Sequence, residues 1–433
     1  MLLKTFKILC IFMLIGLASY WLFIDTIRHY WGSEDQELRV SFWGSYMEYK
    51  MWLDIIAAFE KEHPEIRVKP MYILGAYEAK IQKQMLSRSA PDIITFQDEP
   101  FQRFVRSGNF EDLTPYMSSP GYSIDLDADY WDTAVKSFQY EDRQYAIPIW
   151  GGNNQIFYNK KLFRELGVPF PAEDWTMDDF MQTCRQLTRD VDGDGRIDIF
   201  AYQVPDWVYS LPFVWSTGGR VLDESRQYWC YDSPEILNYF TFVQEMIHKY
   251  RHSPRAVDIA NMNTDIAFLT GRVAMFCSGP WAMPFLRETN IEYGVVNIPK
   301  GAGGQRWTRV SWDALTIFKG SRQKEKAWIF IHFVASMTAQ QIIADYHRSL
   351  PALKETESYI RSKYPQSPFN QFIFALSYSR IQPITVRWNE MARVIARHWG
   401  YLTNNEISPE ETIRNIKSEI LQKKIFREME PKK

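Results

Sequence analysis

An alternation of strand and helix patterns over residues 38–96 constrains the fold of this chain more than any other feature. Apolar and polar residues alternate at 38–42, as in a strand, and apolar residues then recur at helical spacing until Pro64. The patterns predict a strand at residues 38–42, a helix at 49–63, a strand at 66–68, a helix at 77–89 and a strand at 91–96. This order predicts an α/β fold in which helices cover a parallel sheet.

Ligands of such sheets lie beyond the carboxyl ends of the strands. In this chain those ends are Trp43–Tyr46, after the first strand, and Phe96–Glu99, after the last strand of the run. We therefore expect both segments to form part of the rim of a binding site.

A second unit is expected to begin near Ile147. The patterns after this residue predict an extended segment that leads into a helix, helices at 175–188 and 325–336, and extended segments at 294–298 and 314–318. Residues 205–223 are rich in aromatic side chains and contain a Gly-Gly pair, so we expect an aromatic loop there.

Length and charge limit the classes of function. A chain of 433 residues with 46% hydrophobic content is long enough for two lobes, each with its own core. Its 50 basic and 52 acidic side chains give a formal charge of −2. The chain therefore has no excess of positive charge to bind a polyanion, which excludes nucleic acid as a partner. The 16 tryptophans exceed what a core requires, which favours rings that line a site or an interface.

The amino-terminal segment, residues 1–32, is predicted to be a signal peptide or a signal anchor. Lys4 and Lys7 precede an unbroken apolar run at residues 8–24, which favours export of the rest of the chain. Seventeen helical residues span about 25 Å, short of a hydrocarbon core of about 30 Å. Cutting after Ala18 would leave an apolar new terminus, so we favour an uncleaved anchor and a body outside the cytoplasm. Cys10 lacks the small residues before it that a lipoprotein signal needs.

The remaining cysteines, Cys184, Cys230 and Cys277, show no spacing suited to zinc. They allow at most one disulfide. The alternative, three small buried hydrophobic residues, is the one we favour.

Several motifs then occur in one order along the chain: FYNKKLF with GVPFPAEDW, FLTGRVAMFCSGPWA, YGVVNIPKG, SWDALTIFKGSRQKEKAWIFIHFVAS and LPALKE. Together they resemble the extracellular solute-binding proteins of ABC importers, in the carbohydrate-binding branch that includes maltose-binding protein. The likeness covers about residues 38–399.

The resemblance implies a two-lobed, periplasmic-binding-protein-like α/β fold whose lobes close around a ligand. One lobe would hold residues 37–151 and 296–320, and the other 152–295 and 321–433. The hinge would lie near Trp150, Tyr293 and Gly320. The implied partners are a carbohydrate and ABC permease subunits in the membrane, and we expect a monomer that is not an enzyme.

A sugar presents an apolar CH face and a rim of hydroxyls, so its site needs aromatic rings together with carboxylates or amides. Trp281, in the GPW motif, matches the stacking position of the family. Asp98 and Glu99 stand where the family places an acid that grips hydroxyls, although a helix cap ahead of Pro100 is the structural alternative for Asp98. The other candidate ligand-binding residues, each of which could instead be structural, are Trp150, Asn153, Asn154, Trp312, Asp313, Trp43, Tyr46, Trp207 and Trp388.

One segment resembles the first half of an EF-hand loop. The candidate calcium ligands alternate along the sequence DVDGDGRID and are Asp190, Asp192, Asp194, Arg196 through its backbone carbonyl, and Asp198. The twelfth position holds Ala201 in place of the bidentate Glu, so a structural calcium ion and a polar surface turn both remain open. No other cofactor is required.

Two rival functions share some of these features. A glycoside hydrolase also combines an aromatic cleft with acids, but no hydrolase motif accompanies these residues, and no G-x-S-x-G turn occurs. An anchored protein that presents its sugar to a membrane sensor would share every feature, so only its partner would distinguish it.

Overall fold

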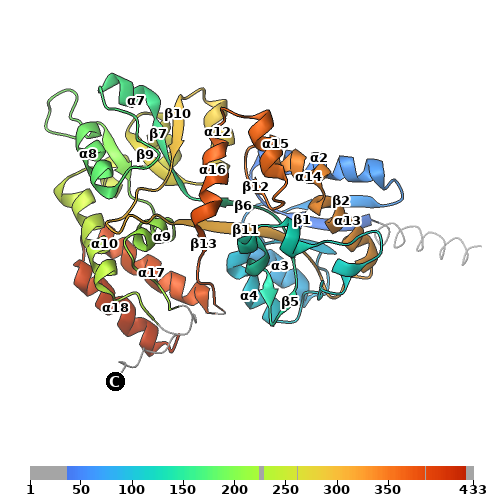
Figure 1. The fold of residues 1–433 in the computed structure, drawn as a ribbon. Coiled ribbons are helices and arrows are strands. Elements are labelled where there is room, and N and C mark those ends of the chain that lie inside the picture. The colour runs from blue at the N-terminus through green and yellow to red at the C-terminus, as the bar shows by residue number, and fades with distance from the viewer. Residues whose placement is uncertain (1–36, 224–228, 261, 386, 426–433) are drawn as a thin grey trace, which may run out of the picture. The chain divides into compact units, whose positions relative to one another are not determined.

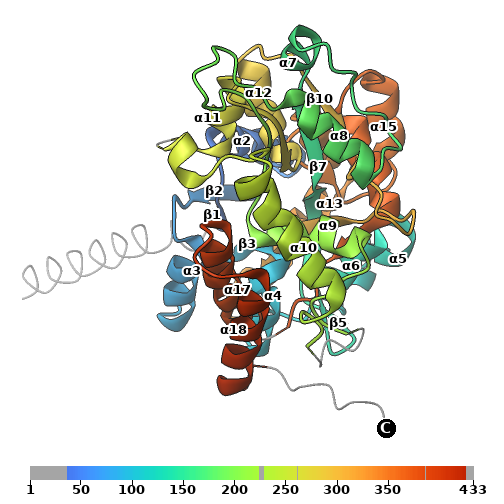
Figure 2. The same ribbon diagram turned by 90° about the vertical axis from the view of Figure 1, so that its left-hand side faces the viewer.

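The computed structural model describes residues 37–223, 229–260, 262–385 and 387–425 (Figures 1 and 2). The predicted signal or anchor segment, residues 1–32 with its apolar run at 8–24, lies outside these residues. The described chain forms two compact units. One consists of residues 37–95 and 317–330, and the other of residues 96–316 and 331–425. The lobe boundaries implied by the resemblance stay a prediction.

The first unit contains the predicted β-α-β-α-β run, which is confirmed. Strand β1 pairs in parallel with both β2 and β3, with Val40 opposite Pro70 on one side and Ile93 on the other. The elements of the run are β1 (Glu37–Phe42), α2 (Tyr46–Glu62), β2 (Arg67–Tyr72), α3 (Tyr77–Leu86) and β3 (Ile93–Gln97).

Helix α2 shows how the local sequence sets these elements. It begins three residues earlier than predicted, because Ser45 is its N-cap and the Glu48 carboxylate accepts the Ser45 backbone N–H. Its buried face includes Trp52, whose ring stacks on Phe42 of β1 with centroids 5.1 Å apart. The helix ends at Glu62, two residues before Pro64, as predicted.

Asp92 attaches the returning segment 317–330 to this sheet. Its carboxylate accepts the Arg39 backbone N–H at 3.0 Å and the Ser321 hydroxyl at 2.7 Å. Helix α13 (Lys324–Ala335) begins in this segment and confirms the helix predicted at 325–336.

The second unit contains two sheets and a short hairpin. In one sheet β6 runs antiparallel to both β11 and β12, and β13 pairs in parallel with β11. The other sheet has the order β10-β7-β9-β8. The strands are β4 (Gln139–Tyr140), β5 (Arg143–Gln144), β6 (Ile147–Asn153), β7 (Gln155–Asn159), β8 (Phe200–Gln203), β9 (Val273–Ser278), β10 (Tyr293–Val296), β11 (Thr308–Ile317), β12 (Leu350–Pro351) and β13 (Ser379–Ile381).

Helices make up most of the remainder of this unit. Near the carboxyl end, α17 and α18 lie side by side at the red end of the colour scale, and α10 packs against both (Figures 1 and 2). The α-helices are α4 (Asp98–Arg106), α5 (Leu126–Asp129), α6 (Asp132–Ser137), α7 (Lys160–Glu165), α8 (Met177–Leu187), α9 (Trp207–Ser216), α10 (Pro234–Gln244), α11 (Thr264–Leu269), α12 (Met283–Glu288), α14 (Met337–Asp345), α15 (Thr356–Lys363), α16 (Phe369–Ala375), α17 (Trp388–Thr403) and α18 (Pro409–Gln422). The short turns of other helix types are η1 (Tyr116–Ser118), η2 (Glu245–Lys249), η3 (Ala256–Ile259), η4 (Pro280–Ala282) and η5 (Leu376–Tyr378).

Two predictions for this unit were wrong in detail. Residues 207–216 form helix α9 and not an aromatic loop, because Asp206 caps the first turn and the helix buries side chains all around, which hides the helical period. Strand β11 begins at Thr308, so Trp312 and Asp313 lie inside it and not ahead of it.

Three further observations concern the sequence predictions. Cys184 and Cys277 are buried free thiols, and Cys230 is half-buried. Among the described residues, no single helix is long and apolar enough to cross a membrane, and only α13 and α14 taken together pass that test. Many side chains of that pair are buried, as in the core helices of globular proteins.

Candidate functional site

Asp98 is the most deeply buried acid among the predicted site residues. It begins helix α4 directly after β3 and has no exposed surface. Ser311 Oγ donates a hydrogen bond to Asp98 Oδ1 at 2.8 Å, whereas Asp98 Oδ2 has no partner in the described part of the chain. Burial raises the pKa of Asp98 to about 6, although Arg309 and the Ser311 hydroxyl act in the opposite direction.

The structural alternative for Asp98 is wrong. The N-cap of α4 is Gln97, and the Asp98 carboxylate is bonded to Ser311 on β11 instead of to the first turn of its own helix. Asp98 therefore carries a buried carboxyl group that the helix does not require as a cap.

Glu99 connects α4 to the first turn of α17. Trp388 Nε1 donates a hydrogen bond to Glu99 Oε1 at 2.9 Å, and the Trp388 ring lies 5.7 Å from that of Trp207. Glu99 is half-buried, whereas both indoles are nearly covered. Two candidate tryptophans and one candidate acid thus meet, although they are far apart in the sequence.

Tyr209 and Arg309 belong to the same group of side chains, and the sequence analysis missed both. The Arg309 guanidinium carbon lies 6.0 Å from the centroid of the Tyr209 ring, and Arg309 Nε donates to Gln382 Oε1 at 2.8 Å. Tyr209 stands two residues after Trp207 in the first turn of α9, so recognising that helix would have placed it beside a candidate residue. Arg309 alternates with Ser311 along β11 and so lies on the same face of the strand.

These contacts group side chains from α4, α9, β11 and α17, and this group is called the aromatic–acid ring. Asp98 is bonded to Ser311, the Arg309 guanidinium lies by Tyr209, and Trp388 contacts both Trp207 and Glu99. The remaining links are between near neighbours on one element, and the residues of the group are Asp98, Glu99, Trp207, Tyr209, Arg309, Ser311 and Trp388.

Trp281 lies at the edge of this ring. Its indole makes an edge contact with Tyr209, with centroids 6.2 Å apart and planes at 80°, and it is half-buried. The indole needs glycine on two sides, because a Cβ on Gly152 would lie 2.8 Å from Cζ3 of Trp281 and one on Gly279 would lie 2.2 Å from Cη2. The glycines of the GPW motif and of β6 are therefore what allow this tryptophan to occupy its position.

Gly151, the neighbouring glycine of β6, makes room for a different tryptophan, Trp312. A Cβ on Gly151 would lie 2.4 Å from Cε3 of Trp312, which has no exposed surface and donates through Nε1 to Thr133 Oγ1 at 3.1 Å. Because side chains alternate along a strand, Trp312 points to the opposite face of β11 from Arg309 and Ser311. The structure therefore does not bring Trp312 into the aromatic–acid ring.

Three candidates around the end of β6, Trp150, Asn153 and Asn154, are buried, and Asp313 is half-buried. Trp150 Nε1 donates to Asp313 Oδ2 at 2.7 Å, and Asn153 Nδ2 donates to the Phe372 carbonyl at 2.7 Å. Asn154 is fully buried, and its side-chain amide has no partner among the described residues. Trp150 and Asn153 thus belong to β6, Asn154 follows it directly, and Asp313 belongs to β11.

Trp43 and Tyr46 lie in the first unit, at the carboxyl end of β1 as predicted. Trp43 is half-buried, and its ring centroid lies 4.6 Å from that of Tyr77. Tyr46 begins helix α2 and is 70% exposed.

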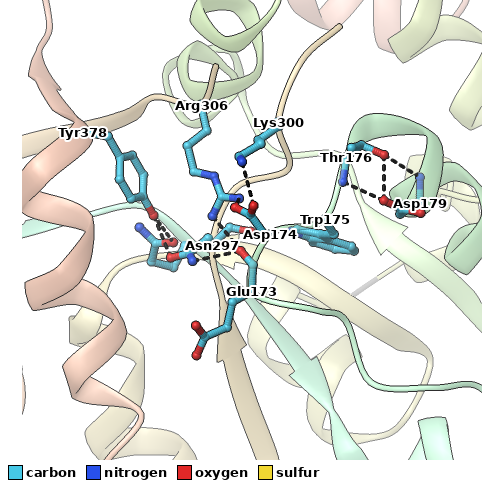
Figure 3. Close-up of polar contacts among 10 residues, drawn as sticks. Glu173, Asp174, Trp175, Thr176, Asp179, Asn297, Lys300, Arg306 and Tyr378 are labelled. Carbon is cyan, nitrogen blue, oxygen red and sulfur yellow. Dashed lines mark hydrogen bonds and ion pairs between the residues drawn. The ribbon is translucent and has the colours of Figure 1, made fainter. Parts of the chain in front are cut away.

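A polar network lies beside the β7 sheet, as Figure 3 shows. Arg306 donates to the Glu173 carbonyl at 2.6 Å and to Asp174 at 2.7 Å, and Lys300 also contacts Asp174 at 2.7 Å. The Tyr378 hydroxyl donates to Asn297 Oδ1 at 2.7 Å. The network thus ties together the segments that lead from β10 into β11 and from η5 into β13.

The predicted calcium loop brings three carboxylates together. One ligand atom from each of Asp190, Asp192 and Asp194 lies within 4.8 Å of the others. Asp198 Oδ1 lies 3.5 Å from the Arg272 guanidinium, and Ala201, at the twelfth position, is buried in β8. The donors of the first half of the loop suit calcium, and the second half offers no bidentate acid.

The chain is similar to known binding proteins. The family model for bacterial extracellular solute-binding proteins matches residues 43–341. A binding protein of Brucella abortus is 23% identical over 79% of this chain and 82% of that protein, and the multiple sugar-binding protein of Streptococcus mutans is 22% identical over 81% and 84%. The structure of an ABC substrate-binding protein of Listeria monocytogenes in complex with cycloalternan superposes with a TM-score of 0.81 at 23% identity, and the match covers 90% of this chain and 99% of that one. This likeness confirms the predicted two-lobed α/β fold class.

Proposed function

Because the chain belongs to the bacterial extracellular solute-binding proteins, we propose that it captures a carbohydrate outside the cytoplasm and delivers it to an ABC permease. The aromatic–acid ring is the observation that carries this proposal. It gathers indoles, a phenol and two adjacent carboxyl groups from α4, α9, β11 and α17, although the sequence separates them widely.

The composition of the ring suits the two faces of a sugar. Aromatic faces stack against CH groups and add about 0.5 to 1.5 kcal/mol beyond the burial of area. A hydrogen bond to a charged group contributes about 1.5 to 3 kcal/mol. The two half-buried rings, Tyr209 and Trp281, and the half-buried Glu99 carboxylate would therefore contribute about 2.5 to 6 kcal/mol. Micromolar affinity corresponds to roughly −8 kcal/mol, so the burial of ligand area must supply the rest and the cost of immobilising the ligand.

The relatives in the comparisons are binding proteins and not enzymes. We propose likewise that this chain releases its sugar unaltered. The extracellular family supports a location outside the cytoplasm. We propose that residues 8–24 are the tether, that ABC permease subunits are the partner and that the working form is a monomer.

Calorimetry with a panel of mono- and oligosaccharides tests the function. We expect at least one sugar to bind without turnover and Trp281→Ala to weaken it at least tenfold, because the indole supplies a stacking face. Phe285→Ala is the matched control, since Phe285 is an exposed aromatic residue on α12, one turn beyond Trp281, and is not a member of the aromatic–acid ring. Wild-type affinity in the Trp281 variant, or conversion of the sugar, would refute the proposal.

We also propose that the loop at residues 190–198 binds a structural calcium ion through Asp190, Asp192, Asp194 and the Arg196 carbonyl. The convergence of three carboxylates on one point supports it, because their mutual repulsion is relieved by a divalent cation. Calcium should raise the thermal unfolding midpoint relative to chelator. An unchanged midpoint would show that the loop is a polar turn that binds no calcium.

A further inference from the structure

The charges of the aromatic–acid ring are unbalanced. Its carboxyl groups are those of Asp98 and Glu99. A third acid, Asp206, directly precedes Trp207 in the chain and caps α9, the helix that carries Trp207 and Tyr209. Arg309 is the cation of this group. The residues that form the ring and its cap therefore carry more negative than positive charge when the acids are ionised.

Arg309 already interacts with Gln382 and Asp98. It is buried, it donates to Gln382, and its charge acts on the carboxyl group of Asp98, whose pKa it lowers against the effect of burial. Arg309 thus offsets part of the charge of Asp98, and Asp98 Oδ2 remains buried without a hydrogen-bond partner among the described residues.

Glu99 is the acid whose charge is left over. It accepts a hydrogen bond from the Trp388 indole, which is a neutral donor, and none of the ion pairs in the described part of the chain includes it. It is half-buried, so solvent screens it only in part. A carboxylate in this position attracts a cation more strongly than a neutral hydroxyl.

The rings beside Glu99 act in the same sense. The half-buried rings of Tyr209, which lies within the field of the Glu99 charge, and of Trp281, 6.2 Å from Tyr209, carry the negative part of the aromatic quadrupole on their faces. A cation held near such faces gains about 0.5 to 2 kcal/mol, which a hydroxyl does not gain.

We propose that the aromatic–acid ring selects a basic saccharide, one that carries a protonated amine, over its neutral counterpart. The proposal rests on the proposed function, because it names the class of sugar that the same site takes. Glu99 supplies the charge that pairs with the ammonium group, and the flanking rings supply the faces.

Ligands that differ only in the substituent at C2 of each sugar ring test this choice in the full chain in detergent. Cellotriose, the corresponding glucosamine trisaccharide and its N-acetylated form differ at C2, and glucose, glucosamine and N-acetylglucosamine repeat the comparison for one ring. Calorimetry at about pH 6.5 and low salt should give an affinity at least tenfold higher for the amine than for the neutral member of the same set. That advantage should shrink as the salt concentration rises.

Glu99→Gln should abolish the preference for the amine while leaving the neutral sugars bound. Asp178→Asn, which removes an exposed acid from the first turn of α8 outside the ring, should retain it. If the neutral sugars bind and the corresponding amino sugars bind no more tightly, the preference for a basic saccharide is refuted and the proposed function stands. If neither these sugars nor the wider carbohydrate panel binds, both fail, and a preference that survives in Glu99→Gln would overturn the role of Glu99.

Discussion

Replacing Asp98 by Asn should reveal how much stability the protein loses by keeping a buried carboxyl group in its candidate site. Asn has the shape of Asp and can still accept the Ser311 hydroxyl, but it never ionises. The variant therefore isolates the free energy of ionising residue 98 in the folded chain.

The magnitude follows from the pKa. Burial raises the pKa of Asp98 from its ordinary value of 3.8 to about 6. Below 3.8 the group holds its proton in both the folded and the unfolded chain, and it costs nothing. As the pH rises from 3.8 to 6, only the unfolded chain loses the proton, so stability falls, and above pH 6 the full cost of about 3 kcal/mol applies, at about 1.4 kcal/mol for each pH unit of difference.

Urea unfolding of the wild type and of Asp98→Asn at about pH 4.5 and 7.5 measures this cost. The difference between their free energies of unfolding should shift by about 2 kcal/mol in favour of Asn at the higher pH. A constant offset from the buried amide cancels in this comparison. Asp178→Asn, at an exposed position, should show no such shift. A difference that stays constant between the two pH values would refute the reasoning, because Asp98 would then ionise as easily in the folded chain as in the unfolded one.

Three further variants test the packing and the donors around the site. Gly151→Ala should lower the free energy of unfolding by about 1 to 3 kcal/mol, because its Cβ would overlap the Trp312 indole, and urea unfolding measures this. Trp388→Phe removes the N–H that binds Glu99, so calorimetry should show weaker sugar binding, and an unchanged affinity would exclude that contact from the site. Asp192→Asn should abolish any rise in the unfolding midpoint on adding calcium, and a rise equal to that of the wild type would exclude this carboxylate as a ligand.

Local patterns in the sequence determined the elements of the first unit. The alternation at Leu38–Phe42, the helical spacing before Pro64 and the apolar strand before Asp98 depend on neighbours within a few residues, so they can be read without tertiary structure. The same reading failed at α9, because a helix that is buried on all sides loses its polar face and with it its period.

The sequence by itself determined the fold class, the family resemblance and the residue types of the site. Only the tertiary structure decided which of these residues meet. Asp98 and Ser311 are separated by 213 positions, and Glu99 and Trp388 by 289, so no local pattern relates them. Trp312 and Ser311, by contrast, are neighbours in the chain, yet the alternation of β11 sends one into the core and the other to Asp98, because a strand turns successive side chains to opposite faces.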